Sequence, residues 1–243
     1  MNRRPLVLLS AIAAIFAGAP MAVHAADPQA AEMPMFWDGL VQVKAKDVKA
    51  VYLRPGADFR PYTKIMLDPT EVDFVKGWVK YVNQSYGAAF DPTDHDDALR
   101  IAKQVRVGFD QVFAKAFAKA GWQVVTQPGP DVLRLSTSVY NLFITEPYTV
   151  TQSGGSSVRT VDAGQASVLI EARDSESGQV IGRAIDVRNV GTRDAYIPRS
   201  TVSNRFDFEM LFDRWANIST KGLETLKTLS PVDLKGEPAK PAP

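Results

Sequence analysis

An apolar stripe between residues 94 and 121 constrains the fold of this chain more than any other feature. Large apolar side chains recur there at every fourth position: Ile101, Val105, Phe109, Phe113 and Phe117. Since an α-helix has 3.6 residues per turn, this spacing puts them on one helix face. Three smaller residues widen the face: Val112, Ala116 and Ala120. We therefore predict a helix that is capped by Thr93 or Asp94, ends at Gly121 and lies on a sheet.

Alternation of inward and outward residues predicts the sheet itself. Residues 133–139 and 166–172 both alternate with the two-residue period of a half-buried strand. A further β-prone segment, Val180–Val190, follows the turn-forming sequence Asp174–Gly178. We expect these three segments to form an antiparallel meander.

Shorter segments complete the predicted fold. Further strands are expected at Val48–Arg54, Tyr62–Leu67 and Trp122–Thr126. The first two of these can pair as a loose hairpin or lie as neighbours. A short helix can form near Val75–Val82, and a long one is expected from about Asn204 to Leu229, where Gly222 would bend or loosen it. The predicted fold class is α+β, a two-layer sandwich of a mainly antiparallel sheet covered by two long amphipathic helices.

The first 25 residues have the three-part layout of a secretory signal peptide. Arg3 and Arg4 form a basic start, an apolar run covers Leu6–Ala19, and compact residues occupy Val23–Ala25. The run is shorter than the roughly 20 apolar residues that a transmembrane helix needs. We expect cleavage near Ala25, a periplasmic or secreted mature protein, and no transmembrane segment in the mature chain.

The rest of the chain is predicted to hold one domain. Residues 26–37 are expected to be a flexible leader, residues 38–230 a single α+β domain, and residues 231–243 a Pro-rich disordered tail. The chain contains no cysteine, which excludes disulfides and a lipid anchor built on a cysteine at the cleavage site.

The charge balance excludes one class of partner. Without Arg3 and Arg4, the 28 basic residues of the chain become 26, against 27 acidic residues. A nucleic-acid-binding protein shows a basic excess or a basic stripe instead. We therefore expect no nucleic-acid partner.

Several short phrases, in this order and spacing, resemble a known family: Asp38-Gly39-Leu40, residues 54–59, residues 62–69, residues 128–133 and residues 174–178. The chain resembles the bacterial domain-of-unknown-function family numbered 3313, and the resemblance covers residues 38 to about 230. It implies an exported envelope protein, because the members are exported and many are lipoproteins. The lipid-bearing cysteine is absent here, so membrane anchoring is not implied. The family has no established activity, so no catalytic residue can be transferred.

No motif in the chain predicts a catalytic or metal centre. The acids around His95, which are Asp91, Asp94 and Asp97, fit neither a calcium loop nor a catalytic zinc site. Their place at a helix start is typical of caps that complement the helix dipole. The chain also lacks the Gly-x-Ser-x-Gly and Ser-x-x-Lys motifs of serine nucleophiles. We predict no catalytic residue, no metal and no cofactor.

Two functions from different classes follow. The first is a non-catalytic, soluble binding or assembly module whose partner is an envelope protein, a lipid or a glycan. The alternative is a carboxylate-dependent hydrolase acting on cell-envelope material, which an acidic pair in an aromatic-lined cleft would favour. The rings of Trp78, Tyr81, Tyr86 and Phe90 can either face such a ligand or pack in the core.

The strand order predicts where a partner binds. In an antiparallel meander, the connections 146–163 and 191–203 lie at the same end of the sheet, opposite the turn 174–178. Long connections of this kind are often functional, and arginine and tyrosine are enriched in interfaces. The predicted partner-binding residues are Tyr148, Arg159, Arg193, Tyr196 and Arg199.

Overall fold

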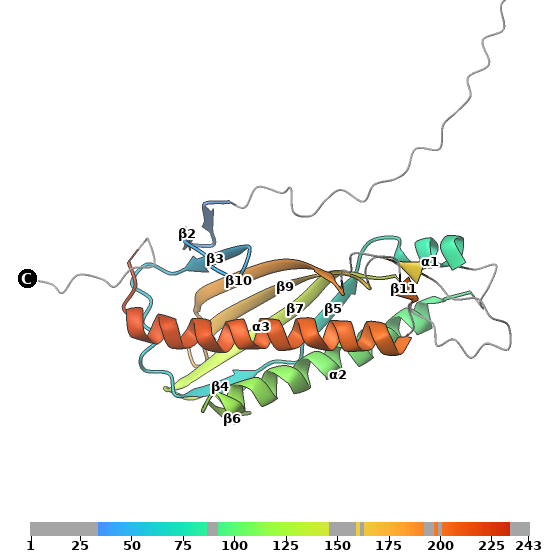
Figure 1. Ribbon diagram of the computed structural model, residues 1–243. Helices are drawn as coiled ribbons and strands as arrows, with labels where there is room; N and C mark the ends of the chain where they lie inside the picture. The colour runs from blue at the N-terminus through green and yellow to red at the C-terminus, as the bar shows by residue number, and fades with distance from the viewer. Residues whose placement is uncertain are drawn as a thin grey trace, which may run out of the picture. The chain divides into compact units, whose positions relative to one another are not determined.

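Two layers, a mixed sheet and a pair of long helices on one of its faces, build the molecule (Figure 1). The computed structural model describes residues 34–86, 92–145, 159–160, 163–191, 197–198 and 201–233. All of these residues belong to the compact unit 32–243. The predicted α+β class with two covering helices is confirmed.

The main sheet has nine strands in the described residues. They are β1 (Phe36–Trp37), β2 (Leu40–Val43), β3 (Ala50–Leu53), β4 (Lys64–Leu67), β5 (Glu71–Phe74), β6 (Gln123–Val125), β7 (Val132–Ile144), β9 (Gly164–Asp174) and β10 (Val180–Val190). The short strands β8 (Arg159–Thr160) and β11 (Ile197–Pro198) pair only with each other. The helices are α1 (Trp78–Tyr86), α2 (His95–Lys119) and α3 (Thr201–Leu229).

The predicted meander is confirmed as the centre of the sheet. Strand β9 pairs antiparallel with β7 on one side and with β10 on the other. The tight turn between β9 and β10 is closed by Asp174, whose carboxylate accepts hydrogen bonds from the backbone N–H and the hydroxyl of Ser177. Around this meander the strand order is β1-β2-β3-β10-β9-β7-β4-β6, with β5 on β7.

The predicted pairing of Val48–Arg54 with Tyr62–Leu67 is wrong. Both segments contain strands, but β3 lies beside β10 and β4 lies parallel to β7, on opposite sides of the meander. The intervening segment begins with a turn, in which the Ala57 N–H donates to the Arg54 carbonyl at 2.9 Å, and then crosses the meander: Phe59 is 1% exposed, and the Tyr62 hydroxyl donates to Asp174 at the end of the meander. The turn expected around Pro55 forms, but burial of these two rings takes the chain across the meander, so the turn does not join β3 and β4 as neighbours.

Helix α2 forms as the apolar stripe predicts. Asp94 caps it with a capping box, in which the Asp94 and Asp97 side chains each accept from the other's backbone N–H. The aromatic residues of the stripe, Phe109, Phe113 and Phe117, are all at most 2% exposed. The helix contacts β4, β5 and β6.

Helix α3 lies beside α2 and covers β10 (Figure 1). Rings from the two helices interlock, with the centroids of Phe109 and Phe212 5.2 Å apart. The helix is continuous through Gly222, where the sequence predicts a bend or a looser turn.

Three described strands of the main sheet were absent from the sequence prediction, as were β8 and β11. Strands β1 and β2 extend the sheet beyond β3, and β5 pairs parallel with β7. The short helix expected near Val75–Val82 forms as α1, and its Trp78 is core: the ring is 1% exposed, stacks on Phe74 and donates to the Ile144 carbonyl. Tyr81 is 42% exposed.

Candidate functional site

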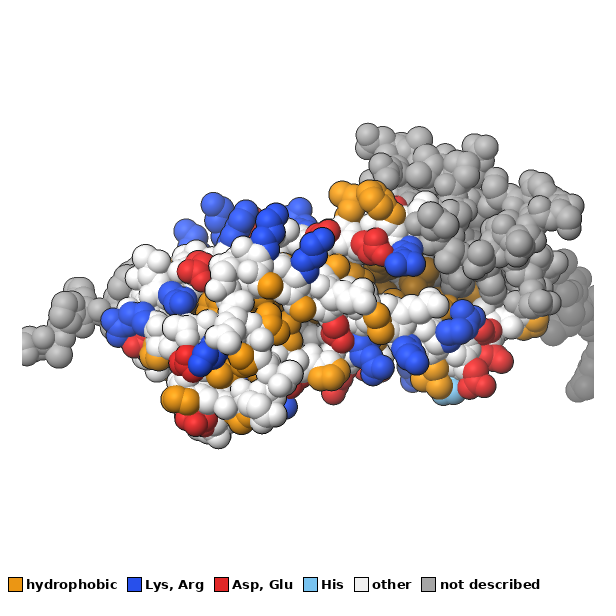
Figure 2. Space-filling view, turned by 90° about the horizontal axis from the view of Figure 1, so that it is seen from below, with side chains coloured by type: hydrophobic (Ala, Val, Ile, Leu, Met, Phe, Trp, Pro, Cys, Tyr) orange, Lys and Arg blue, Asp and Glu red, His pale blue; other side chains and the backbone are white. Residues whose placement is uncertain are grey.

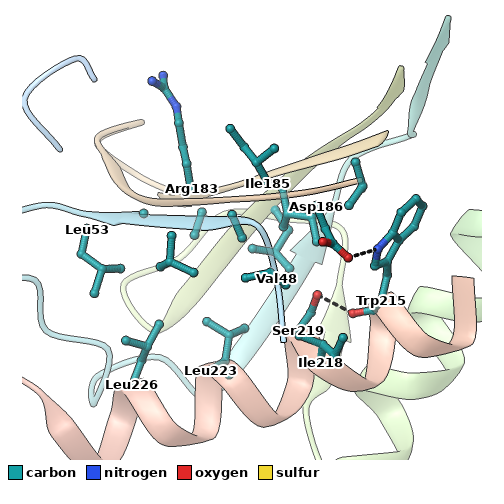
Figure 3. A pocket seen from close by; sticks show the side chains of 18 of the residues that line it. Val48, Leu53, Arg183, Ile185, Asp186, Trp215, Ile218, Ser219, Leu223 and Leu226 are labelled. Atoms are coloured by element: carbon teal, nitrogen blue, oxygen red, sulfur yellow. Dashed lines mark hydrogen bonds between the residues drawn. The ribbon is translucent and has the colours of Figure 1, made fainter. Parts of the chain in front are cut away.

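A groove lined largely by apolar side chains lies between α3 and the helix-facing side of β3 and β10 (Figure 3). Its volume is about 120 Å³. Aliphatic side chains form most of its walls, among them Val48, Val51, Leu53, Ile218, Leu223 and Leu226. The lining residues of α3 run from Trp215 to Leu226, which is three turns or about 16 Å along the helix. The groove is therefore long and narrow.

Missing side chains create this space. Gly182 and Ala184 are two small lining residues on β10, and Gly222 lies between Ile218 and Leu226 on the same i, i+4 row of α3. A Cβ atom built at Gly222 would meet no heavy atom within 4 Å. The space at Gly182 is tighter, because a Cβ there would lie 3.1 Å from Cδ2 of Leu53. A larger side chain thus has room at Gly222 on α3 but little room at Gly182 on β10.

One end of the groove is polar. Asp186, whose side chain is 4% exposed, accepts a hydrogen bond from Nε1 of Trp215 at 2.9 Å and one from Nε of Arg188 at 2.7 Å. Arg188 also donates to the backbone carbonyl of Asp47. The Ser219 hydroxyl donates to the Trp215 carbonyl at 2.7 Å. This end therefore contains an internally neutral ion pair.

Both hydrogen bonds to Asp186 reach the same oxygen, Oδ2. No hydrogen bond from the described part of the chain reaches Oδ1, and Figure 3 shows Asp186 among the side chains that line the groove. A carboxylate oxygen accepts hydrogen bonds and donates none when it is ionised. Oδ1 is therefore an acceptor available to a ligand inside an otherwise apolar site.

Arg183 lines the groove only with its backbone side, because its guanidinium points away from it (Figure 3). On the opposite face of the sheet this guanidinium binds Glu171 and Asp38 and lies 4.2 Å above the Trp37 ring. The Arg183 charge is thus compensated outside the groove.

A second, more polar cavity of about 440 Å³ lies between α2 and β5. Glu71 and Asp73 line it together with Lys103 and Arg106. None of the described residues that line it is aromatic. Seen from below, charges of both signs alternate with apolar side chains over the helix layer (Figure 2).

The acids near His95 act as a helix cap. Asp97 is held by its bond to the Asp94 N–H and by Arg100, and these contacts lower the pKa of the Asp97 carboxyl, the Arg100 hydrogen bond most. Within the described ranges, no group of three or more His, Cys, Asp or Glu side chains could hold a metal ion. Asp91 lies outside those ranges.

The predicted partner-binding residues lie almost entirely outside the described residues. This applies to Tyr148, Arg193, Tyr196 and Arg199, while Arg159 is placed by its backbone in β8. Strand β8 pairs with β11, with Arg159 opposite Pro198. Parts of the two long connections are thus side by side, and their five predicted contact residues remain a prediction.

Family comparison identifies the chain. The family described as protein of unknown function DUF3313 matches residues 31–218. The chain belongs to the DUF3313 family. The resemblance found in the sequence is thereby confirmed. No curated protein matches this DUF3313 chain.

Solved structures of low identity also align with this DUF3313 protein. A PelC dodecamer from Paraburkholderia phytofirmans is 12% identical with a TM-score of 0.34, over 70% of this chain and 96% of that chain. Protein XCC0632 from Xanthomonas campestris is 11% identical with a TM-score of 0.35, over 72% and 89%. A minor lipoprotein from Acinetobacter baumannii is 12% identical with a TM-score of 0.32, over 68% and 94%. Similarity at this level transfers no function to the DUF3313 protein.

Sequence reasoning missed the groove of this DUF3313 protein. The signals were present but weak: two small residues two apart in a strand, Gly182 and Ala184, and a glycine inside an amphipathic helix, Gly222. Only the crossing of these elements turns absent side chains into a cavity. Among the described helices, none combines the length and apolarity needed to cross a bilayer.

Proposed function

We propose that this DUF3313 protein is an exported, soluble, non-catalytic binding module of the bacterial cell envelope, located in the periplasm or secreted. Its groove beside α3 holds the aliphatic part of a ligand. One observation carries the proposal: the groove has aliphatic walls along about three turns of α3 and one internally neutral ion pair at its end. Sites for small molecules commonly combine apolar walls with few convergent polar groups. The layout of residues 1–25 supports export.

The groove chemistry supports binding over catalysis. Among the described residues that line the groove, Asp186 is the single carboxylate, and its charge is paired with that of Arg188. The Ser219 hydroxyl donates to the Trp215 carbonyl, and no base among the described residues is bonded to it that would activate it as a nucleophile. A hydrolase of the kind that uses two carboxylates would require a second acid facing Asp186. The binding module is therefore favoured over the hydrolase alternative.

An aliphatic chain gains free energy at this site by leaving water. Each buried methylene contributes about 0.8 kcal/mol, which corresponds to roughly fourfold in affinity. A buried water molecule needs two to four polar partners to be well bound, and the mostly apolar walls of the groove offer few. Water in the groove is therefore easily displaced. Affinity should therefore rise with chain length until the groove is full.

The test is a calorimetric titration of the mature protein with 1-hexanol, 1-heptanol and 1-octanol. We expect the affinity to increase roughly fourfold per methylene. Gly222→Leu fills the groove from α3 and should abolish binding. Gly108→Leu is the matched control, since Gly108 is also a helical glycine whose added Cβ meets nothing within 4 Å, but it lies on α2. Equal affinity for all three alcohols, or unchanged binding by the Gly222→Leu protein, would contradict the proposal.

A second proposal concerns the end of the sheet at which β7 and β10 finish. The pairing of β8 with β11 supports a common surface formed by the connections 146–163 and 191–203. We propose that an anionic or protein partner from the envelope binds there through Tyr148, Arg159, Arg193, Tyr196 and Arg199. Crosslinking pulldown from envelope extract tests it with Arg159, Arg193 and Arg199 all changed to alanine. Loss of the recovered partner, with octanol binding retained as a check of folding, is expected; undiminished recovery would exclude this surface.

A further inference from the structure

The polar groups at one end of the groove restrict which ligand head group can bind there. Resting on the proposed function, we infer that the groove selects a neutral aliphatic chain bearing a hydroxyl donor, and discriminates against a carboxylate on a chain of the same length. The hydroxyl lies at the Asp186 end, and the chain runs along α3 toward Leu226. An aliphatic alcohol or the hydroxyl of a hydroxylated acyl chain has this chemistry.

The donor requirement follows from Asp186. Its Oδ2 is already bonded to Trp215 and Arg188, while Oδ1 receives no donor from the described residues. The Asp186 side chain is only 4% exposed, so an apolar group placed against Oδ1 would remove the little contact with water that this oxygen has, whereas a ligand hydroxyl that donates to Oδ1 replaces it. Ser219 adds a second oxygen nearby whose own proton is directed to the Trp215 carbonyl. The groups at this end are thus arranged to accept a hydrogen bond.

Discrimination against a carboxylate follows from the charges. A ligand carboxylate would bring a second negative charge beside Asp186, where like charges in a buried site repel strongly. Arg188 is not among the described residues that line the groove, and its charge is already paired with Asp186, while its Nη2 donates to the Asp47 carbonyl. Arg183, which does line the groove, directs its charge to Glu171 and Asp38 on the opposite face of the sheet. A neutral donor meets none of this repulsion.

The experiment compares three compounds of similar chain length at pH 7: 1-octanol, octyl methyl ether and sodium octanoate. Titration is followed by calorimetry and by the fluorescence of Trp215, with Trp215→Phe protein identifying the signal of that ring. We expect octanol to bind at least tenfold more tightly than octanoate and several-fold more tightly than the ether, which cannot donate. Equal affinities of octanol and octanoate would overturn the inference while leaving the proposed aliphatic site intact. Binding of none of the three would instead remove the proposed function.

A variant that removes the charge of Asp186 tests whether this residue causes the selectivity. Asp186→Asn retains an oxygen for Trp215 but leaves Arg188 without its counter-charge, so octanoate should gain at least tenfold relative to octanol. Asp58→Asn is the matched control: Asp58 also pairs with an arginine two residues later, Arg60, but lies outside the groove. Unchanged selectivity in a folded Asp186→Asn protein would refute the assignment. If that variant does not fold, the three-compound comparison on the wild-type protein still decides the inference.

Discussion

The indole N–H of Trp215 donates a 2.9 Å hydrogen bond to Oδ2 of Asp186, and this bond connects α3 to the centre of β10. Both residues are buried, with exposed fractions of 1% for Trp215 and 3% for Asp186. The bond therefore has two roles: it holds the covering helix on the sheet, and it fixes which oxygen of Asp186 is left for the groove.

Trp215→Phe should destabilise the protein by about 2–3 kcal/mol, because a hydrogen bond to a charged group contributes about 1.5–3 kcal/mol and its loss leaves Asp186 less well paired. Denaturant unfolding followed by circular dichroism measures the change. Trp122→Phe is the matched control, since Trp122 is also buried but no described group bonds to its Nε1. A loss in Trp215→Phe no larger than in Trp122→Phe would show that the bond adds no stability.

Phe113→Ala should destabilise the protein by about 3–5 kcal/mol, the range for removing a buried phenylalanine. Phe113 is 2% exposed, and its ring stacks 4.1 Å from that of Phe109. Thermal and denaturant unfolding give the size of the effect. Val107→Ala, on the same helix but 44% exposed, should change stability by less than about 0.5 kcal/mol. A melting temperature of the Phe113→Ala protein equal to wild type would mean that the stripe does not form the core.

Stability should fall at alkaline pH through Tyr62. Burial, aided by its hydrogen bond to Asp174, raises the pKa of Tyr62 to about 12. Between pH of about 10 and 12 the unfolded chain has lost this proton while the folded protein keeps it, so the free energy of unfolding decreases as pH rises. Tyr62→Phe should reduce that slope by up to about 1.4 kcal/mol per pH unit. Denaturant unfolding at several pH values compares the slopes; identical slopes for the two proteins would place Tyr62 in a solvent-like environment.

Export should leave a mature chain that starts at Ala26. This follows from the basic start, the apolar run and the compact residues Val23–Ala25. Intact-mass measurement of the protein from the soluble periplasmic or secreted fraction checks both the cleavage and the absence of a lipid. Retention of Met1 or an added acyl mass would contradict the expectation.

The sequence predicted correctly those helices and strands whose apolar side chains recur with a regular period. The i, i+4 stripe that includes Phe109 predicts α2, and the two-residue alternation after Leu133 predicts the meander, because burial on one face imposes a repeat that the sequence itself displays. Strand β5 at Glu71–Phe74 escaped, since a four-residue segment shows too few repeats to distinguish it from a loop. The family was also readable from the order of short phrases.

The pairing of the strands and the groove beside α3 depended on the tertiary structure. The segment around Pro55 reads locally as a turn, yet Phe59 and Tyr62 bury their rings and carry the chain to the other side of the meander. No local signal reports this, because Asp174, which binds the Tyr62 hydroxyl, is 112 residues away and Ser230, which binds the Phe59 N–H, is 171 residues away. The sequence thus determined the two covering helices and the central strands. Only the packing of α3 on β10 decided that Gly182 and Gly222 would border one groove and that Asp186 would lie at its end, since a cavity is defined by where distant elements meet.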